Sequence, residues 1–565
     1  SIPAGFEFAT AAYLGAGVNA AVRGFGEALL ARHGKAGRQW EGQQGDVSLN
    51  KLGFSTDNGA FYYYWSGNFS SPEAALESVQ TSAVAQDIPF AYVLLDSWWY
   101  FKGASGGVSN WTARPDQFPH GLAAFTKRTG WPVVGHNRYW ASDTVYAKQN
   151  GGKYEFIVEK AKQKAIPTEQ AFWDDLMASS TAWGLAVYEQ DWLHNEWEGL
   201  DATLQSATLA RTWLMQMGAA ASKANLTIQY CMAYARFALA SVEIPSVSQI
   251  RVTDDYQVDL THARSFSVNL YTGTSSMLAA ALGLAPSKDT WWSEKTFAPP
   301  NPKYPSDARE NFPAVEAAVA TFTAGPVQPG DSAGHTNRPL VMCSCTKDGT
   351  LLKPAWPATP VDAYFSFRAG ISTAGPDGEV YATHSVLDTP SGDAPYIVVH
   401  ALAIDLKADY SIPLRDLTHM PLDPRMSYFS WSANTASCSE SLPADVLVQQ
   451  GATALDLHAC GKADFRLVHA APAVQCGTEQ LGLLGEAGKW VPVSRQRFGR
   501  PFCRGDSLAV PVFGTPGEKV DVRFARHSDG AVHAAVLSTG CVFDPSGKAV
   551  ATSAGTCDAG HVATA

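Results

Sequence analysis

Short apolar runs alternate with helix-like stretches from residue 51 to about residue 345, and this alternation constrains the fold more than any other feature. Continuous apolar runs are typical of parallel strands that are covered on both faces. One of the intervening helices has a recognisable start at Ser71-Pro-Glu, with Ser as N-cap and Pro in the first turn. The runs are Leu52–Ser55, Phe90–Leu95, Val133–Gly135, Leu185–Tyr188, Leu226–Tyr230, Ile250–Thr253, Leu284–Asp289 and Ala320–Thr323.

Eight such runs predict a (β/α)8 TIM barrel that closes near residue 345. A doubly wound parallel sheet is the rival, but no Gly-rich phosphate loop follows any of the runs. We therefore expect an α/β barrel.

The pattern changes after Pro354, where short β-rich segments are separated by Gly, Pro and Asp turns. A chain of 565 residues is too long for one hydrophobic core. We predict a helical segment at residues 1–50, a catalytic barrel at 51–355 and an all-β sandwich domain with disulfides at 356–565.

Six of the nine cysteines fall late in the chain and suit up to three disulfides, whose connectivity the sequence does not define. They are Cys438, Cys460, Cys476, Cys503, Cys541 and Cys557. Three glycosylation sequons begin at Asn68, Asn110 and Asn225. Together these features indicate a secreted or extracellular glycoprotein, or one of a vacuolar or lysosomal lumen. No signal peptide is visible at Ser1, so we expect the numbering to begin at a mature or trimmed N-terminus.

Charge and hydropathy exclude two classes of partner. The formal net charge of −11 argues against nucleic acid, because phosphate binding needs a basic face. No run of eighteen apolar residues is present, which argues against a membrane partner. The 17 Trp and 20 Tyr residues suit either core packing or stacking on sugar rings.

Two of the predicted strands end in carboxylates. The stretch GLAVYEQDWL (184–193) passes from an apolar run to Glu189, Gln190 and Asp191, and QIRVTDDY (249–256) ends in Asp254 and Asp255. Carboxyl ends of barrel strands meet on one rim, so we expect the two groups to lie close together.

Several segments resemble raffinose synthases and alkaline α-galactosidases, which are members of glycoside hydrolase family 36 in clan D. The similar segments follow the family's order and cover residues 50–375 in patches. They are DQFPHGLAAF (116–125), CMAY (231–234), IRVTDDY (250–256), AGPVQPGDSAGHTNRPLV (324–341), CTKDGTLLKPAWPATPVD (345–362) and YFSFRAG (364–370).

The resemblance implies retaining cleavage or transfer of α-glycosides by two aspartates. Asp191 takes the position of the nucleophile. Asp255 takes that of the acid/base, four residues after Arg251, with Asp254 as its close competitor. A retaining site predicts the two carboxyl groups at about 5–5.5 Å, against roughly 6.5–9.5 Å for an inverting one.

Further residues are expected to bind the sugar, each with a structural alternative. Asp96 matches one of two family aspartates and could otherwise form a turn, whereas Trp98 could be a core residue and His136 a structural one. Asp331 matches the strand-eight loop, where a structural hydrogen bond is as plausible. The candidates are Asp96, Trp98, His136, Glu189, Trp192, Arg251, Asp254, Trp291 and Asp331.

Two departures from the family affect sugar specificity. Relatives carry Lys at the position of Glu189 and a second aspartate at the position of Ser97. An anion cannot make the contacts of a cation, so a different or modified α-linked sugar is expected. The departures leave two alternatives to an α-galactosidase-like hydrolase, namely a raffinose-synthase-type transferase and an inactive extracellular carbohydrate-binding or structural protein.

The expected partner is an oligosaccharide or glycoconjugate substrate. Neither a metal nor an organic cofactor is expected, because the two-aspartate mechanism needs none and no ligand cluster is visible in the sequence.

Overall fold

The structure is a computed structural model that describes most of the chain. Its description leaves out residues 1–3, 8–9, 39–44, 259–269, 297–298, 388–394, 414–416, 418–426, 434, 436–437, 439–445, 450–453, 529–531, 540, 544–548 and 552–565.

The chain divides into two compact units, and neither unit is one continuous stretch. The first comprises Ser1–Leu14, Val22–Glu310 and Gly325–Thr336. The second comprises Gly15–Ala21, Asn311–Ala324 and Asn337–Ala565. The sequence-based boundaries near residues 50 and 355 stay predictions.

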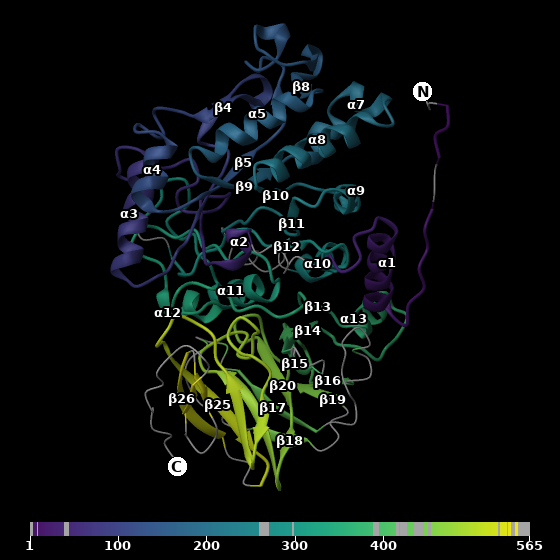
Figure 1. Cartoon of the computed structure of the whole chain (residues 1–565), viewed down its shortest axis with the longest axis vertical. Helices are drawn as coiled ribbons and strands as arrows, with labels where there is room; N and C mark the ends of the chain where they lie inside the picture. The colour runs from purple at the N-terminus through teal and green to yellow at the C-terminus, as the bar shows by residue number, and fades with distance from the viewer. Residues whose placement is uncertain are drawn as a thin grey trace. The chain divides into compact units, whose positions relative to one another are not determined.

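The first unit contains a curved parallel sheet of seven strands in the order β1-β2-β5-β9-β10-β11-β12, as the α/β prediction requires (Figure 1). All neighbouring strands pair in parallel, and the chain order equals the spatial order, as in a TIM-type barrel. The strands are β1 (Phe54–Ser55), β2 (Val93–Leu95), β5 (Val133–Asn137), β9 (Leu185–Gln190), β10 (Thr227–Tyr230), β11 (Val247–Arg251) and β12 (Ala285–Ser287).

An extended segment at residues 325–331 lies between the two edges of this sheet. Val327 O and Pro329 O accept hydrogen bonds from Gly53 N and Ser55 N at 3.0 and 3.1 Å. On its other side, Gly330 N donates to Trp291 O at 2.9 Å. The segment contains Pro326 and Pro329, which have no N–H to donate, so it bonds both edges without forming a regular strand.

The predicted eighth strand at Ala320–Thr323 is wrong. These residues end helix α11 (Pro313–Phe322), and Thr323 is its C-cap. Pro313 at the first position and an alanine-rich sequence favour a helix here. A short apolar run cannot distinguish a buried strand from a buried helix, and the adjoining residues 325–331 take the eighth position instead.

Helices follow most of the strands, and α5 and α8 run side by side in Figure 1. Ser71 is the N-cap of α3, as expected, because its hydroxyl accepts from Ala74 N at 3.2 Å. The other helices are α1 (Val18–Arg32), α2 (Val47–Asn50), α3 (Pro72–Ala85), α4 (Leu122–Thr129), α5 (Gln170–Thr181), α6 (Leu193–Glu198), α7 (Asp201–Gln205), α8 (Leu209–Lys223), α9 (Ala235–Ala240), α10 (Leu270–Ala281), α12 (Arg338–Val341) and α13 (Asp362–Arg368).

The connections that follow β2 and β5 form a second, smaller sheet in this unit, with order β3-β4-β6-β8-β7. Both connections begin at carboxyl ends of barrel strands, where TIM-barrel enzymes build their sites. The sequence did not indicate this sheet. Its strands are β3 (Tyr100–Lys102), β4 (Val108–Ala113), β6 (Trp140–Ala141), β7 (Phe156–Glu159) and β8 (Lys164–Pro167).

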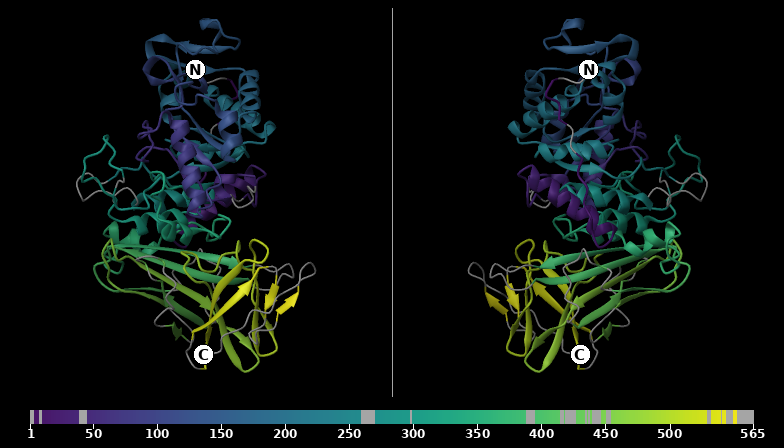
Figure 2. Two further views of the ribbon diagram at one scale, coloured as in Figure 1. Left: turned by 90° about the vertical axis from the view of Figure 1, so that its left-hand side faces the viewer. Right: turned by 90° about the vertical axis from the view of Figure 1, so that its right-hand side faces the viewer.

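The second unit is built mainly from antiparallel sheets, which agrees with the predicted all-β domain. Its long strands run side by side in both views of Figure 2. The largest sheet has the order β13-β14-β15-β20-β17-β18. These strands are β13 (Thr359–Pro360), β14 (Glu379–Leu387), β15 (Tyr396–Ile404), β17 (Tyr428–Ser432), β18 (Val446–Gln449) and β20 (Arg466–Pro472).

A buried apolar cluster joins this sheet to a four-stranded one, as in a sandwich. Val398 and Phe429 of the first sheet pack in one cluster with Leu483 and Val522 of the second. The remaining strands are β16 (Tyr410–Pro413), β19 (Ala454–Leu457), β21 (Val474–Cys476), β22 (Glu479–Glu486), β23 (Phe502–Arg504), β24 (Ser507–Pro511), β25 (Lys519–Arg526), β26 (Val532–Ser538), β27 (Cys541–Phe543) and β28 (Ala549–Ala551).

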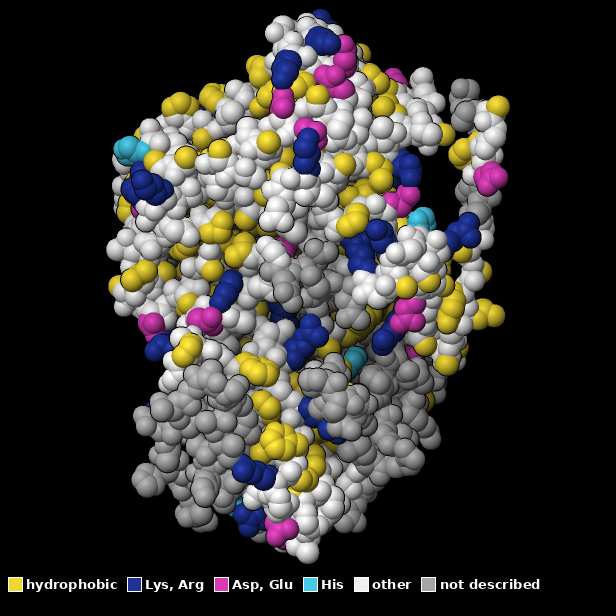
Figure 3. Space-filling view, viewed as in Figure 1, with side chains coloured by type: hydrophobic (Ala, Val, Ile, Leu, Met, Phe, Trp, Pro, Cys, Tyr) yellow, Lys and Arg dark blue, Asp and Glu magenta, His cyan; other side chains and the backbone are white. Residues whose placement is uncertain are grey.

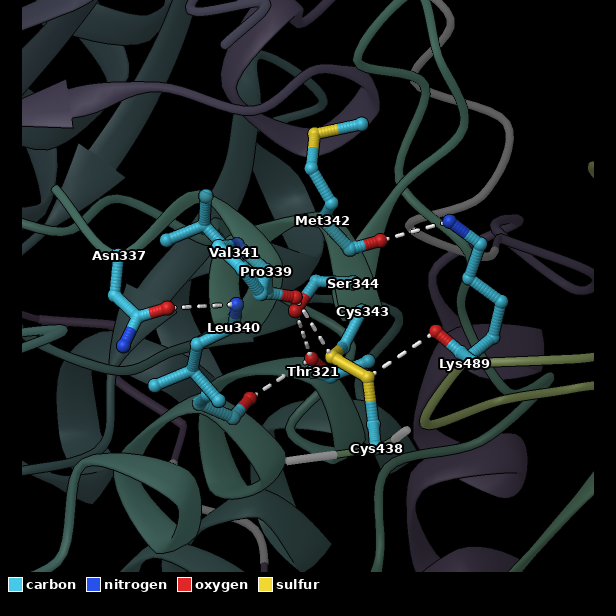
Figure 4. The surroundings of a disulfide bond; sticks show 12 residues. Thr321, Asn337, Pro339, Leu340, Val341, Met342, Cys343, Ser344, Cys438 and Lys489 are labelled. Atoms are coloured by element: carbon cyan, nitrogen blue, oxygen red, sulfur yellow. Dashed lines mark hydrogen bonds between the residues drawn. A yellow bond between two sulfur atoms is a disulfide. The ribbon is translucent and has the colours of Figure 1, made fainter. Parts of the chain in front are cut away.

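Two disulfides lie within the second unit, Cys343–Cys438 and Cys476–Cys503. Pairing of Cys438 with Cys343 corrects the expectation that the six late cysteines pair among themselves, because Cys343 precedes that cluster by 95 residues. Beside this bond, Lys489 donates to Met342 O at 2.8 Å (Figure 4). Cys460 is free, and the side chains of Cys541 and Cys557 lie outside the described residues.

Candidate active site

Asp191 lies one residue beyond β9, the fourth strand of the sheet in chain order. Its backbone N donates to Asn137 O at 2.8 Å, so the ladder with β5 continues to this residue. Side chains alternate along a strand, so Val187, Glu189 and Asp191 point the same way, and Val187 packs with Leu94 and Val134. Asp191 therefore faces the barrel interior above an apolar layer.

The Asp191 carboxylate is held from two sides. His136 Nε2 lies 3.0 Å from Oδ2, and Trp192 N donates to Oδ1 at 2.6 Å. The other ring nitrogen of His136 lies 3.1 Å from the Tyr100 hydroxyl, which suits a ring whose Nε2–H donates to Asp191. Burial acts to raise the pKa of Asp191, but the hydrogen bond and charge of His136 hold this pKa below its ordinary value.

Asp255 follows β11, the sixth strand, and has the opposite shift. Its Oδ1 lies 3.3 Å from Arg251 Nη2, and 53% of the side chain is exposed. Partial desolvation raises the pKa of Asp255 although Arg251 opposes the shift, and the charges of Asp57 and Asp191 add to it. The adjacent Asp254 is exposed, and its backbone O accepts a hydrogen bond from Arg251 at 3.2 Å. Arg251 therefore contacts the carboxylate of Asp255 but only the backbone of Asp254.

Arg251 is the centre of a buried ion network. Its Nη1 lies 3.0 Å from Asp57 Oδ2, and its Nη2 contacts Asp289. Asp57 follows β1 and Asp289 follows β12, so the ends of three strands, β1, β11 and β12, meet at one guanidinium when Asp255 is included. Sequence reasoning did not select Asp57, which comes two residues after the run Leu52–Ser55, or Asp289, which ends the run Leu284–Asp289. Their position at the ends of predicted strands was a signal, but their contact with Arg251 was not visible in the sequence.

Glu189 is buried, 1% exposed, and incompletely bonded. Its Oε1 accepts from Gln229 Nε2 at 3.3 Å, whereas its Oε2 has no hydrogen-bond partner. Burial raises the pKa of Glu189 well above its ordinary value, and the charges of Asp57 and Asp191 add to the shift. The shift favours the protonated form of this group.

Asp96 also lies in this group of carboxyls. Its Oδ2 is 3.7 Å from His136 Nε2, and Ser97 Oγ donates to its Oδ1 at 2.7 Å. Burial raises the pKa of Asp96 to about 7, although His136 opposes the shift. The Ser97 hydroxyl also lies 2.7 Å from the Tyr64 hydroxyl. Serine at this position, where the family has an aspartate, therefore still makes hydrogen bonds in the site.

Three of the predicted sugar-binding residues have structural partners instead. Trp98 is 2% exposed, stacks on Phe118 and donates to Thr56 Oγ1 at 3.0 Å. Trp291 is fully buried. Asp331 accepts from the backbone and hydroxyl of Ser293 at 2.9 and 2.7 Å, and burial raises its pKa to about 7. Burial favours packing and loop support for these three residues, and their role in sugar binding stays a prediction.

Trp192 is half-buried directly after Asp191 and has a positive φ of 56°. Its ring stacks on His194 with centroids 6.0 Å apart, and the Arg138 guanidinium lies 5.0 Å above it. A left-handed conformation is strained for a non-glycine residue, and such strain is concentrated at functional sites.

A cavity of about 1170 Å³ opens beside Arg251 and Asp255. It is lined mainly by small, apolar and hydroxyl side chains from the ends of β10 and β11 and from α9 and α10. They include His194, Met232, Tyr234, Ala238, Thr253, Thr274, Ser275 and Leu278.

Other ligand classes find little support among the described residues. No group of three or more His, Cys, Asp or Glu side chains in this part of the chain could hold a metal ion. Every helix there is too short or too polar to span a bilayer. On the face shown in Figure 3, basic and acidic side chains are interspersed over the described surface.

No protein-family model matches the chain, and comparison with curated proteins gave no match. Several solved enzyme structures align with parts of the chain. An α-galactosidase from Lactobacillus brevis aligns at a TM-score of 0.47 and 12% identity, over 80% of this chain and 59% of that one. An α-1,4-glucan lyase from Gracilariopsis lemaneiformis aligns at a TM-score of 0.42 and 8% identity, over 91% of this chain and 61% of that one. An α-galactosidase from Thermus thermophilus aligns at a TM-score of 0.34 and 15% identity, over 55% of this chain and 65% of that one.

All three identities are below 25% and all three TM-scores are below 0.5. The resemblance to raffinose synthases and alkaline α-galactosidases stays a prediction.

Proposed function

We propose that this protein is a retaining glycoside hydrolase in which Asp191 is the nucleophile and Asp255 the acid/base. One arrangement carries the proposal: two aspartates follow the fourth and sixth barrel strands, Asp191 lies 3.0 Å from His136 Nε2 and Asp255 lies 3.3 Å from Arg251 Nη2, and their pKa values are displaced in opposite directions. A nucleophile must be ionised and a general acid must hold its proton at the same pH.

In the first step, Asp191 attacks the anomeric carbon as Asp255 protonates the departing oxygen. The bond from that carbon to the leaving oxygen breaks, and an ester to Asp191 forms. In the second step, Asp255 removes a proton from water, which hydrolyses the ester. His136 holds the Asp191 carboxylate for the attack, since it donates to the oxygen that Trp192 leaves unbonded.

The finer assignment is an α-galactosidase-like hydrolase that acts outside the cell. The α-linkage and the kinship with galactosidases derive from the sequence resemblance alone. The two disulfides support an oxidising compartment, since such bonds are rare in the cytosol. Glu189 lies close enough to Asp191 and Asp96 for their charges to act on it, and it stands where relatives have Lys. This replacement supports a sugar other than unmodified galactose.

The test is turnover of aryl α-glycosides, galactosides and glucosides included, by the wild type and by Asp191→Ala. We expect the substitution to abolish turnover. A 2-deoxy-2-fluoroglycosyl fluoride should label Asp191 in the wild type, seen by peptide mass spectrometry. Lack of turnover on every substrate, with sugar binding retained, would refute the proposal and favour the carbohydrate-binding alternative.

A further inference from the structure

Two strained residues stand side by side at the rim of the site. Trp192 and Met232 have φ values of 56° and 42°, and each lies two residues beyond the end of a barrel strand, directly after Asp191 and Cys231 respectively. His194 fastens the two loops together, because its N and Nδ1 lie 3.3 and 3.2 Å from Met232 O. Strain that is retained in this way points to a functional surface.

An aromatic row extends along this rim from the nucleophile outward. Trp192 stacks on His194 with an interplanar angle of 21°, and His194 lies 5.4 Å from the Tyr234 ring. Tyr234 is 49% exposed and Met232 is 37% exposed. An exposed aromatic ring beside a flexible thioether offers an apolar face with a polar tip, which suits the C–H face of a pyranose ring.

The cavity beside this row lies on the leaving-group side of the site. His194, Met232 and Tyr234 line it together with Asp255, whereas its described lining does not include Asp191. The general acid delivers its proton to the leaving oxygen, so whatever is attached to that oxygen must lie beside Asp255. The reacting sugar instead lies beside Asp191.

The size of this cavity argues for an extended leaving group. Its volume of about 1170 Å³ exceeds the roughly 300–1000 Å³ that is usual for sites binding small molecules. Hydroxyl side chains of Thr253, Thr274 and Ser275 supply hydrogen-bonding groups on its other walls. This combination of apolar face and hydroxyl groups matches an oligosaccharide.

Resting on the proposed glycosidase function, we propose that His194, Met232 and Tyr234 form the subsite for the leaving sugar. The substrates are then oligosaccharides whose leaving group holds at least one pyranose ring, rather than glycosides of small alcohols. Bond making and breaking are those of the retaining mechanism: the electron pair of the broken bond stays on the leaving oxygen, which receives the proton of Asp255.

The experiment compares two kinds of substrate that share the reacting sugar. A glycosyl fluoride has a leaving group without a ring, whereas di- and trisaccharides place one or two rings in the subsite. The α-galactosyl and α-glucosyl series are both used. The variants are Tyr234→Ala and His194→Ala, and Tyr13→Ala is the matched control, because Tyr13 is 48% exposed and Tyr234 is 49% exposed.

We expect kcat/KM of the wild type to rise from the disaccharide to the trisaccharide. Tyr234→Ala should lower kcat/KM for the trisaccharide roughly tenfold more than for the fluoride, the effect of losing one well-placed aromatic contact. Tyr13→Ala should act equally on both. Tyr234→Phe should restore most of the trisaccharide activity, because it retains the ring.

Equal losses on the fluoride and the trisaccharide would overturn this assignment, since they would mean that Tyr234 supports the site as a whole. Failure of the proposed function looks different, because the wild type would then hydrolyse neither the fluorides nor the saccharides.

Discussion

His136 Nε2 lies 3.0 Å from Asp191 Oδ2, and the two residues come from neighbouring strands whose ladder continues to Asp191. Strand pairing therefore fixes the position of the ring relative to the carboxylate. The same nitrogen lies 3.7 Å from Asp96 Oδ2, so one ring stands between a carboxyl with a lowered pKa and another whose pKa is about 7. The pKa of Asp191 is lower than that of Asp96 in part because Asp191 receives the hydrogen bond from His136.

Replacement of His136 by Ala should slow catalysis and shift its pH profile. Loss of the hydrogen bond raises the pKa of Asp191, so the acid limb of kcat/KM should move to higher pH. We expect kcat/KM at neutral pH to fall on the order of a hundredfold. The exposed His335 supplies the control, since His335→Ala should leave both quantities unchanged. An unmoved acid limb would mean that His136 does not set the ionisation of Asp191.

Substitution of Asp255 by Asn should remove the general acid. The rate on substrates with sugar leaving groups should fall roughly 10²–10⁴-fold, whereas glycosyl fluorides, whose leaving group needs no proton, should be affected far less. Asp254→Asn is the matched control on the adjacent residue. If Asp254→Asn produced the selective loss instead, the acid would be Asp254, which also fits the sequence pattern.

Loss of Arg251 should destabilise the first unit. Arg251→Met leaves Asp57 and Asp289 buried without their cation, and removal of one partner from a buried ion network costs about 3–5 kcal/mol of unfolding free energy. Denaturant titration followed by tryptophan fluorescence measures the change. Arg211→Met is the control, because Arg211 is 57% exposed in its pair with Glu243 and should contribute less than about 1 kcal/mol.

The second unit contains a buried pair of histidines that should make it sensitive to acid. His400 and His469 are cross-strand partners on β15 and β20, with Nδ1 atoms 2.7 Å apart. Burial lowers the pKa of His469 to about 3 and that of His400 well below its ordinary value, and His469 and His384 add to the shift of His400.

Because the folded-state pKa of His469 is depressed, its stabilising contribution is fully present above about pH 6.5 and is lost as the pH falls toward 3. For His469 alone, the loss between pH 7.5 and pH 5 should be about 2 kcal/mol. Thermal unfolding at the two pH values tests this, with His469→Gln as the variant that weakens the dependence. The same pH dependence in both proteins would refute the assignment to His469.

The parts of the fold that the sequence predicted are those with an unambiguous local pattern. The runs at Val133–Gly135 and Leu185–Tyr188 are rich in residues that suit a buried strand, and both are strands. Ala320–Thr323 was misassigned because a run of four residues is too short to distinguish the period of a strand from that of a helix. The segment that closes the sheet, at residues 325–331, lacks a strand-like sequence because it contains two prolines.

Asp191 could be proposed as a site residue from the sequence because a single strand end, read by itself, points to it. The network around Arg251 was not predictable, because it requires Asp57 and Asp289 to meet across the closure of the sheet, which depends on strand order and register. Burial of Trp98 was likewise invisible, since an aromatic residue at a strand end has the same local sequence whether it faces Phe118 or a sugar.

The interleaving of the two units along the chain has a consequence for synthesis on the ribosome. All segments of the first unit have been translated once residue 336 is made, so this unit can complete its folding early. The second unit contains Gly15–Ala21, which comes before the long segment Val22–Glu310 of the first unit, and Asn337–Ala565, which comes after it. Its earliest segment must therefore remain available until Pro360 and Asp362, which bond Asn19, have emerged from the ribosome.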